Sequence, residues 1–303
     1  MTSPVPSIAV LLATHDAVGL VEEQVRSILD QKGVSVTIVA SDDGSTDGTL
    51  ELLQRLSIAE PRLQILPRTT RFGSGAPNFY HLLREVDLSP FDAIAFADQD
   101  DVWFDWKLAT HLELLREKRV GGVSSSVLAF WSDGRERVVE KGGAQRRHDH
   151  LFQSPGPGCT FLVTPELATV VRTCLEREEL GASRFAFHDW LVYAIARSSG
   201  MGWHISDRPS LRYRQHGSNE WGANFGLGAG LRRVGRLVDG TYGRWVSEIL
   251  LVAREAALLT GAPPPPRRIS AVQIALEGRR RLPDRLLLAA THPLGVRARG
   301  TSR

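Results

Sequence analysis

Cysteine is scarce in this sequence, and long apolar runs are missing. The two cysteines, Cys159 and Cys174, cannot build a disulfide framework or a four-cysteine zinc site. The longest apolar candidate, around residues 249–259, is interrupted by Arg254 and Glu255 and is shorter than the roughly 20 residues that span a bilayer. The opening residues, MTSPVPS, lack a basic stretch before the first apolar run, so we expect no secretory signal. These absences predict a reduced, cytoplasmic protein.

Missing motifs weaken two function classes. The first predicted strand-to-helix turn, ATHDAVG, lacks the G-x-G-x-x-G phosphate loop of dinucleotide-binding oxidoreductases. No recognised nucleic-acid-binding motif accompanies the basic residues, so we expect no nucleic acid as a partner. Apolar residues make up 42% of the 303-residue chain, which is ordinary for a globular protein and excludes wholesale disorder.

Charge is divided unevenly along the chain. The whole sequence carries +3, but residues 225–303 contain 14 arginines, no lysine and five acids. That segment therefore carries +9, which leaves −6 for residues 1–224. The pattern predicts an acidic globular body with a basic C-terminal extension. Two interpretations of the extension stay open: its arginines are solvated on helices that pack on the body or on a second subunit, or they bind an anionic partner such as phospholipid headgroups.

Strand-like and helix-like segments alternate four times in the first part of the chain. This alternation predicts an α/β fold with a mostly parallel central sheet flanked by helices. Ligands of such sheets bind outside the carboxyl ends of the strands, where polar clusters fall in this sequence. The predicted strands are 7–14, 34–41, 63–67 and 91–98, and the predicted helices are 21–29, 50–56, 79–86 and a segment that begins at 107.

An acidic cluster follows the fourth predicted strand. Asp98, Asp100 and Asp101 place three carboxylates within four residues, and such crowding becomes favourable when a divalent cation lies between them. Mg²⁺ and Mn²⁺ prefer carboxylate oxygen and usually keep waters and substrate phosphates as further ligands. A solvated turn is the alternative, but the buried strand before the cluster favours a metal site.

Two more polar clusters end the first and second predicted strands. Asp42 and Asp43 either form a turn before the next helix or accept hydrogen bonds from a base or a ribose. His15, in Thr14-His15-Asp16, is either structural or stacks on a planar base.

Taken in order, several motifs resemble family 2 glycosyltransferases with the GT-A fold. ATHDAVGLVEEQVRSILDQ, SDDGSTDGT and FADQDDVWFDWKL carry the first part of the resemblance, and ADQDDVW is similar to the bacterial rhamnosyltransferase-like branch. GPGCTFLVTPEL, HDWLVYAIA and YRQHGSNEWGAN are similar to later segments of the family. The resemblance covers about residues 7–224. It departs at His15, where a base-stacking tyrosine is common, and at Arg71-Phe72-Gly73, where Asn-x-Gly is common.

The resemblance implies an inverting, metal-dependent glycosyltransferase with Mg²⁺ or Mn²⁺ as cofactor. Its donor would be a nucleotide-diphosphate sugar, with dTDP-rhamnose as the candidate, and its acceptor a hydroxyl of a bacterial surface glycan or of a lipid-linked glycan. It implies Asp189 as general base, although a charge at a helix end is the alternative. The other implied site residues are Thr14, His15, Asp16, Asp42, Asp43 and Asp98 for the nucleotide; Asp98, Asp100 and His216 for the metal; and Asp101, Trp103, Trp190, Arg212 and Arg214 for substrate or phosphate.

The resemblance also divides the chain. We expect a catalytic domain over residues 1–224, with a nucleotide-binding half of about 1–118 and an acceptor half of about 119–224. Residues 225–303 form the helical extension, with helices predicted over 231–259 and 269–290. We predict that this extension contacts the anionic inner membrane face from the cytoplasm. Cys159 is expected to be a packing residue. The alternative function is a catalytically weak or inactive nucleotide-sugar-binding module, which loss of Asp100 or Asp189 would favour; both residues are present.

Overall fold

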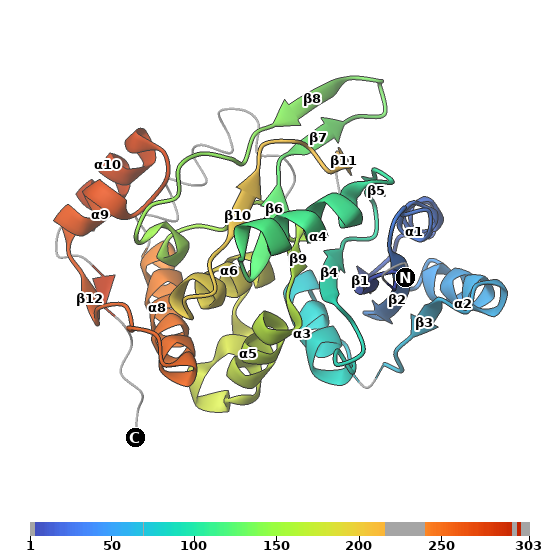
Figure 1. The fold of residues 1–303 in the computed structure, drawn as a ribbon, viewed down its shortest axis with the longest axis horizontal. Helices are drawn as coiled ribbons and strands as arrows, with labels where there is room; N and C mark the ends of the chain where they lie inside the picture. Colours follow the sequence, from blue (N-terminus) through green and yellow to red (C-terminus); the bar gives the residue numbers. More distant parts are fainter. Residues whose placement is uncertain (1–3, 69, 216–239, 293–295, 298–303) are drawn as a thin grey trace.

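A seven-stranded sheet forms the centre of the protein (Figure 1). The computed structural model describes residues 4–68, 70–215, 240–292 and 296–297. The strand order is β10-β6-β9-β4-β1-β2-β3, and β9 runs antiparallel to β4 and β6 while the other neighbours pair in parallel. The strands are β1 Ser7–Thr14, β2 Ser35–Asp42, β3 Leu63–Ile65, β4 Ala93–Ala97, β6 Gly122–Ser125, β9 Leu162–Val163 and β10 His204–Ser206.

Helices cover both faces of this sheet. Side chains of a strand alternate between faces, so Ile8, Val10 and Leu12 of β1 lie in one hydrophobic core while Ala9 and Leu11 lie in the other. The expected α/β fold with a mostly parallel central sheet is confirmed. The first core is covered by α1 Val21–Leu29, α2 Thr49–Ala59 and α4 Lys107–Lys118, and the second by α3 Gly75–Glu85, α5 Pro165–Glu176, α6 His188–Ser198 and α8 Thr241–Thr260.

A smaller sheet lies beside the carboxyl end of β4. Its strand order is β5-β11-β7-β8, and Leu211 of β11 pairs with Trp103 of β5, directly after the acidic cluster. Short 3-10 segments link the larger elements. The bounds are β5 Val102–Trp103, β7 Val127–Phe130, β8 Glu136–Val139 and β11 Leu211–Arg214, with 3-10 segments at Asp149–Leu151, Gly158–Thr160, Glu178–Leu180 and Ala182–Arg184.

The C-terminal segment differs from its prediction in two ways. The single helix expected over 269–290 is two helices, α9 Ala271–Glu277 and α10 Leu282–Thr291, because α9 ends at Gly278 and α10 begins with proline in its first turn. Ile269 belongs instead to β12 Arg268–Ile269, which pairs with β13 Val296–Arg297. The predicted helix over 231–259 is described only from residue 241 onward.

Helix α8 is part of the protein core. Ile249 and Leu250 are fully buried and Val252 is 2% exposed, in the same core cluster as residues of α5 and α6. These side chains are therefore unavailable to a membrane. In the part of the chain that the structure describes, no helix combines the length and the apolar character that crossing a bilayer requires.

Candidate active site

A cleft of about 1520 Å³ opens at the carboxyl ends of β1 and β4. Thr14, His15 and Asp43 line it at the ends of β1 and β2, and Asp189 and Trp190 line it at the start of α6. Single small-molecule pockets commonly hold about 300–1,000 Å³. The cleft therefore has room for two ligands side by side, as a transfer reaction between a donor and an acceptor requires.

Asp42 and Asp43 perform different tasks at the end of β2. Asp42 is buried and accepts hydrogen bonds from the backbone N–H groups of Gly44 and Ser45, at 3.0 and 2.9 Å, and from Thr14 Oγ1 at 3.1 Å. It thus holds the turn and does not line the cleft. Asp43 lines the cleft and accepts from the backbone N–H groups of Phe72 and Gly73.

A glutamine inside the acidic cluster ties the two strand ends together. The His15 N–H donates to Gln99 Oε1, and Gln99 Nε2 donates to the His15 carbonyl at 2.9 Å. Asp16, with φ of 46°, accepts from the Thr46 N–H at 2.7 Å. Sequence reasoning missed Gln99, although its place between Asp98 and Asp100 was the available signal.

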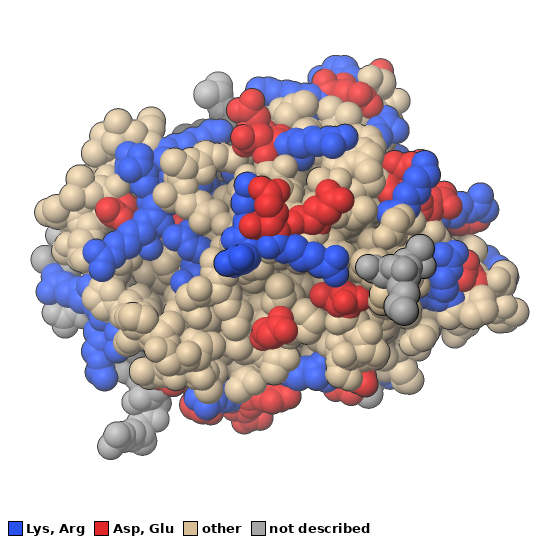
Figure 2. Space-filling model, in the orientation of Figure 1, with Lys and Arg blue, Asp and Glu red and all other residues tan. Residues whose placement is uncertain are grey.

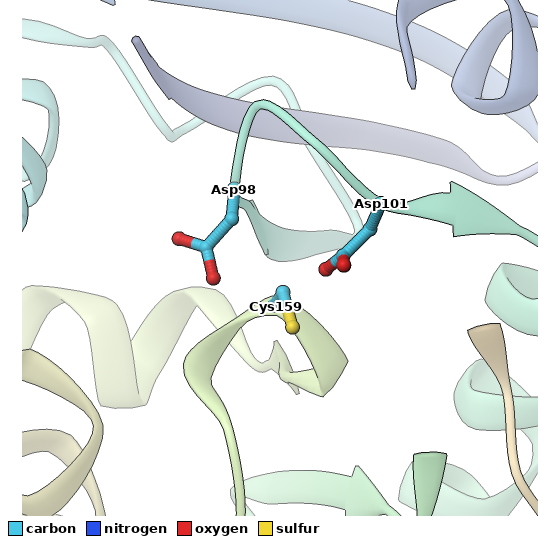
Figure 3. A group of neighbouring side chains, drawn as sticks. All are labelled: Asp98, Asp101 and Cys159. Atoms are coloured by element: carbon cyan, nitrogen blue, oxygen red, sulfur yellow. The ribbon is translucent and has the colours of Figure 1, made fainter. Parts of the chain in front are cut away.

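The carboxylates of the acidic cluster differ in their access to the cleft. Asp98 and Asp100 line the cleft, whereas Asp101 is 1% exposed and faces Cys159 beneath it (Figure 3). Ligand atoms of Asp98, Asp101 and Cys159 lie within 4.8 Å of one another. Burial, together with the charges of Asp100 and Asp98, holds the pKa of Asp101 well above its ordinary value. Burial and the neighbouring Asp101 charge likewise raise the pKa of the Cys159 thiol.

These residues fit a hard divalent cation. Asp101 Oδ1 accepts from the Arg214 N–H at 3.3 Å, while its buried Oδ2 has no N–H or O–H donor among the described residues. A cation held by Asp98 and Asp101, the two carboxylates that the structure brings together, would relieve the carboxylate repulsion, and Asp98 lines the cleft. The protonated Cys159 thiol is a poor ligand for Mg²⁺ or Mn²⁺, and its complete burial agrees with a packing role. His216 lies outside the described residues.

A buried lysine supports the cluster from below. Lys107 is fully buried; its Nζ donates to the Cys159 carbonyl at 2.9 Å and lies 3.0 Å from the centroid of the Trp103 ring. Burial lowers the pKa of Lys107, and the nearby Cys159, Asp101 and Asp98 oppose that shift. Trp103 is therefore a core residue that contacts Lys107, and it does not line the cleft.

The two arginines of β11 also stand behind the cleft. Arg214 Nε donates to the Asp100 carbonyl at 2.9 Å and its Nη2 pairs with Glu23, so it braces the backbone of the acidic cluster. Arg212 pairs with Glu136 at 2.7 Å and lies 4.4 Å from the Phe130 ring. Neither guanidinium lines the cleft, whereas Arg71, which the sequence analysis gave no role, does.

Asp189 occupies the first turn of α6 and faces the cleft. Burial raises its pKa from 3.8 to about 6, although the Trp190 N–H, the Ser154 side chain and the Lys141 charge pull in the opposite direction. The Trp190 N–H donates to Asp189 Oδ1 at 2.7 Å. A carboxylate that titrates close to neutral pH is suited to accept a proton there.

His188, the residue before Asp189, is held firmly in the wall. Its ring lies 4.1 Å from the Phe79 ring and 5.9 Å from the Phe96 ring, and burial lowers its pKa to about 3. A Cβ atom on Gly158 would lie 2.0 Å from His188 Nε2, so only glycine fits there. This contact fixes the start of α6 and hence the position of Asp189.

The C-terminal extension completes the far wall of the cleft with aromatic rings. Trp190 stacks on Tyr242 of α8 with ring centroids 5.8 Å apart, and Phe187 meets Trp245 edge-on at 4.7 Å. All four rings line the cleft. Aromatic faces of this kind suit the apolar faces of sugars, because they offer large contact area at little entropic cost.

Three consecutive arginines between α9 and α10 line the same end of the cleft. Arg280 pairs at 3.2 Å with the fully buried Asp149, which also pairs with Arg197, and donates to the Ser154 carbonyl at 2.8 Å. Arg279 donates to the Phe152 carbonyl. Arg281 is exposed and forms no ion pair with any described residue. The cleft thus carries acidic side chains where β4 ends and basic side chains where α9 and α10 meet.

Comparison with known proteins assigns the family. The sequence profile described as "Glycosyl transferase family 2" matches residues 9–168. The dTDP-rhamnosyl transferase RfbG of Shigella flexneri is 35% identical over 239 residues, which cover 78% of this chain and 83% of that protein. The chain belongs to glycosyl transferase family 2. It is therefore a glycosyltransferase that resembles rhamnosyltransferases, as the sequence motifs predicted.

Solved structures agree with the fold of this glycosyltransferase. TarS of S. aureus, determined with UDP-GlcNAc, aligns over 84% of this chain and 71% of its own, with a TM-score of 0.56 and 14% identity. The mannosyltransferase PcManGT of Pyrobaculum calidifontis, determined with GDP-Man and Mn²⁺, aligns over 96% of this chain and 88% of its own, with a TM-score of 0.51 and 19% identity. These likenesses confirm the GT-A fold expected from the sequence.

Proposed function

We propose that this glycosyltransferase transfers rhamnose from dTDP-rhamnose to a hydroxyl of a bacterial surface glycan on a lipid-linked acceptor, with inversion and with Mg²⁺ or Mn²⁺. The observation that carries the proposal is the raised pKa of Asp189, about 6, in the same cleft that Asp98 and Asp100 line. The relative RfbG, named for its use of dTDP-rhamnose, supports the choice of donor.

The donor would lie along the acidic wall. Asp43 and the His15 ring line the space for the nucleoside, and Arg71 offers a guanidinium to phosphate. Asp98, Asp100 and Asp101 would hold the divalent cation, which as a Lewis acid neutralises the charge that develops on the diphosphate leaving group. Arg214 supports the acidic cluster directly, through its hydrogen bonds to Asp101 Oδ1 and the Asp100 carbonyl. Lys107 supports it indirectly, through its hydrogen bond to the Cys159 carbonyl.

The acceptor hydroxyl would lose its proton to Asp189. As the hydroxyl oxygen forms its bond to the anomeric carbon, the bond from that carbon to the diphosphate oxygen breaks and the proton moves to an Asp189 carboxylate oxygen. Attack from the side opposite the leaving group inverts the configuration. Asp189 requires its ionised form for this step, and a pKa of about 6 supplies that form at neutral pH.

The far wall supports a glycan acceptor that carries an anionic group. Phe187 and Trp245 present rings to a sugar, and the exposed Arg281 presents a guanidinium whose planar fork matches phosphate. A lipid-linked acceptor carries both chemistries. We therefore place the enzyme at the cytoplasmic side of the inner membrane, in peripheral contact with it.

A donor panel tests this function. Purified enzyme with Mn²⁺ would be assayed for binding and slow hydrolysis of dTDP-rhamnose, UDP-galactofuranose, UDP-glucose and GDP-mannose, with the anomeric configuration of the product followed by NMR. Preference for dTDP-rhamnose and an inverted product are expected. Preference for another donor would refute the rhamnose assignment, and a retained configuration would refute the role of Asp189.

A further inference from the structure

Helix α10 exposes leucines and buries an arginine. Leu282, Leu286 and Leu287 are 54%, 54% and 44% exposed, whereas Arg285 is 8% exposed and donates to the Leu276 carbonyl of α9. A surface helix of a globular protein ordinarily does the reverse, with polar residues outside. The outward face of α10 is thus apolar although its inward face is already anchored in the core by Leu288.

Helix α9 extends the same apolar surface. Val272 and Leu276, one helical turn apart, are 67% and 62% exposed, while Ile274 is buried in the core. Helices α9 and α10 pack against each other, and exposed apolar side chains gathered on neighbouring elements mark a site of interaction with a protein or a membrane. We call it the leucine face, and it comprises Val272, Leu276, Leu282, Leu286 and Leu287.

The surroundings of the leucine face favour an anionic partner. Residues 267–287 contain six arginines, of which Arg267, Arg268 and Arg281 are exposed, but only Glu277 and Asp284 as acids. Figure 2 shows Lys and Arg gathered over this end of the molecule with few acidic residues among them. Basic residues flanking an apolar helical face are typical of helices that lie in the headgroup region of anionic bilayers.

The leucine face begins directly beside the cleft. Arg281 lines the cleft, and the next residue, Leu282, already belongs to the leucine face. We propose that the leucine face inserts into an anionic phospholipid surface and so holds the basic end of the cleft at the level of the headgroups. That this orientation serves a lipid-linked acceptor rests on the proposed function; the membrane contact itself does not.

Vesicle co-sedimentation of the full chain tests the proposal. The test variant is Leu286→Glu/Leu287→Glu, and the matched control is Ile58→Glu on α2, which is 85% exposed at the opposite end of the molecule (Figure 1). Wild type and control should bind vesicles that contain phosphatidylglycerol and should bind pure phosphatidylcholine far more weakly. The affinity of the test variant for these vesicles should fall about tenfold or more, because burial of each leucine in the bilayer contributes to the free energy of membrane binding. Leu276→Gln on α9 should weaken binding independently.

Vesicle binding and molar mass decide whether the membrane contact stands. Wild-type protein that ignores anionic vesicles, or a folded test variant that binds them as well as wild type does, removes the membrane contact. If the test variant binds vesicles as wild type does but has a lower molar mass than wild type by light scattering, the leucine face is an interface between copies of the chain. Hydrolysis of dTDP-rhamnose in vesicle-free solution should be equal in all variants. If wild type lacks that hydrolysis but binds vesicles as described, the proposed function fails and the leucine face stands.

Discussion

Replacement of Asp189 by asparagine separates catalysis from packing. The amide keeps the size of the side chain but cannot take a proton. A positioned general base contributes about 10²–10⁴-fold to rate, so kcat should fall by that factor, equivalent to about 3–5 kcal/mol in the barrier. Donor affinity should change little, because Asp189 is not among the residues proposed to hold nucleotide and metal, which follow β1, β2 and β4 whereas Asp189 begins α6.

Asp189→Asn should lower kcat but raise the free energy of unfolding. The pKa of Asp189 is raised from 3.8 to about 6, so the folded protein binds the proton more tightly than the unfolded chain does. The ionised carboxylate therefore costs stability, a cost that is absent below pH 4, grows as the pH rises towards 6 and is complete above it. At 1.36 kcal/mol per pKa unit the upper bound is about 3 kcal/mol, and the partial exposure of the side chain reduces it to roughly 1–3 kcal/mol. Asp189→Asn should gain that amount at pH 7.

Three measurements check this prediction. They are transfer to a defined acceptor, donor binding by calorimetry, and urea unfolding at pH 5 and pH 8. Wild-type kcat should fall as the pH drops through about 6, as the base becomes protonated. Asp133→Asn, on an exposed turn, is the control: hydrogen bonds from Arg135 lower the pKa of Asp133 below 3.8, so it stays ionised from pH 5 to pH 8, and its replacement should alter neither the rate nor the difference in stability between those two pH values. Retained turnover in Asp189→Asn would remove Asp189 from the mechanism, and a loss of stability would show that the carboxylate serves packing.

Three further perturbations test other parts of the site. Calorimetry should show that wild type binds dTDP much more weakly in EDTA than in Mn²⁺, because the carboxylates repel the diphosphate when no cation is bound. Asp100→Asn should bind dTDP weakly even in Mn²⁺. Equal affinities under these conditions would refute the metal site. Gly158→Ala should cost about 1–3 kcal/mol by displacing His188, and should lower kcat, whereas Gly19→Ala, which meets no atom within 4 Å, should do neither. A chain that ends at residue 224 should not fold, because α8 buries four large aliphatic side chains worth roughly 6–12 kcal/mol against a total stability of about 5–15 kcal/mol. A soluble, cooperatively unfolding 1–224 fragment would contradict that account.

The structure of residues 1–118 is easier to predict from the sequence than that of residues 119–224. Local patterns suffice for β1 and α1, since continuous apolar runs and helical spacing depend only on neighbours in the chain. The acidic cluster follows a strand whose end must lie at the sheet edge, so the placement of Asp98 and Asp100 in a cleft is also predictable.

The errors arise where distant segments decide the environment of a residue. Trp103 looks like a wall residue from its place after the acidic cluster, but the ammonium of Lys107, four residues further on, packs against the face of its ring. Arg212 looks like a phosphate ligand until β8 supplies Glu136. On α10 the helical period is evident, but period alone does not reveal that the arginine turns inward and the leucines outward.

Acceptor specificity should reside mainly outside the segment that the family profile matches. Residues 9–168 contain the acidic wall of the cleft, whereas Asp189, Trp245 and Arg281 all lie beyond it. The C-terminal extension also reaches the candidate base indirectly: Arg280 holds the Ser154 carbonyl, and the Ser154 side chain interacts with Asp189. An extension that forms one wall of the cleft and steadies the segment beside the base can change with the acceptor while the donor wall stays as it is. Exchange of residues 240–292 between related transferases should therefore alter acceptor choice and leave the donor sugar unchanged.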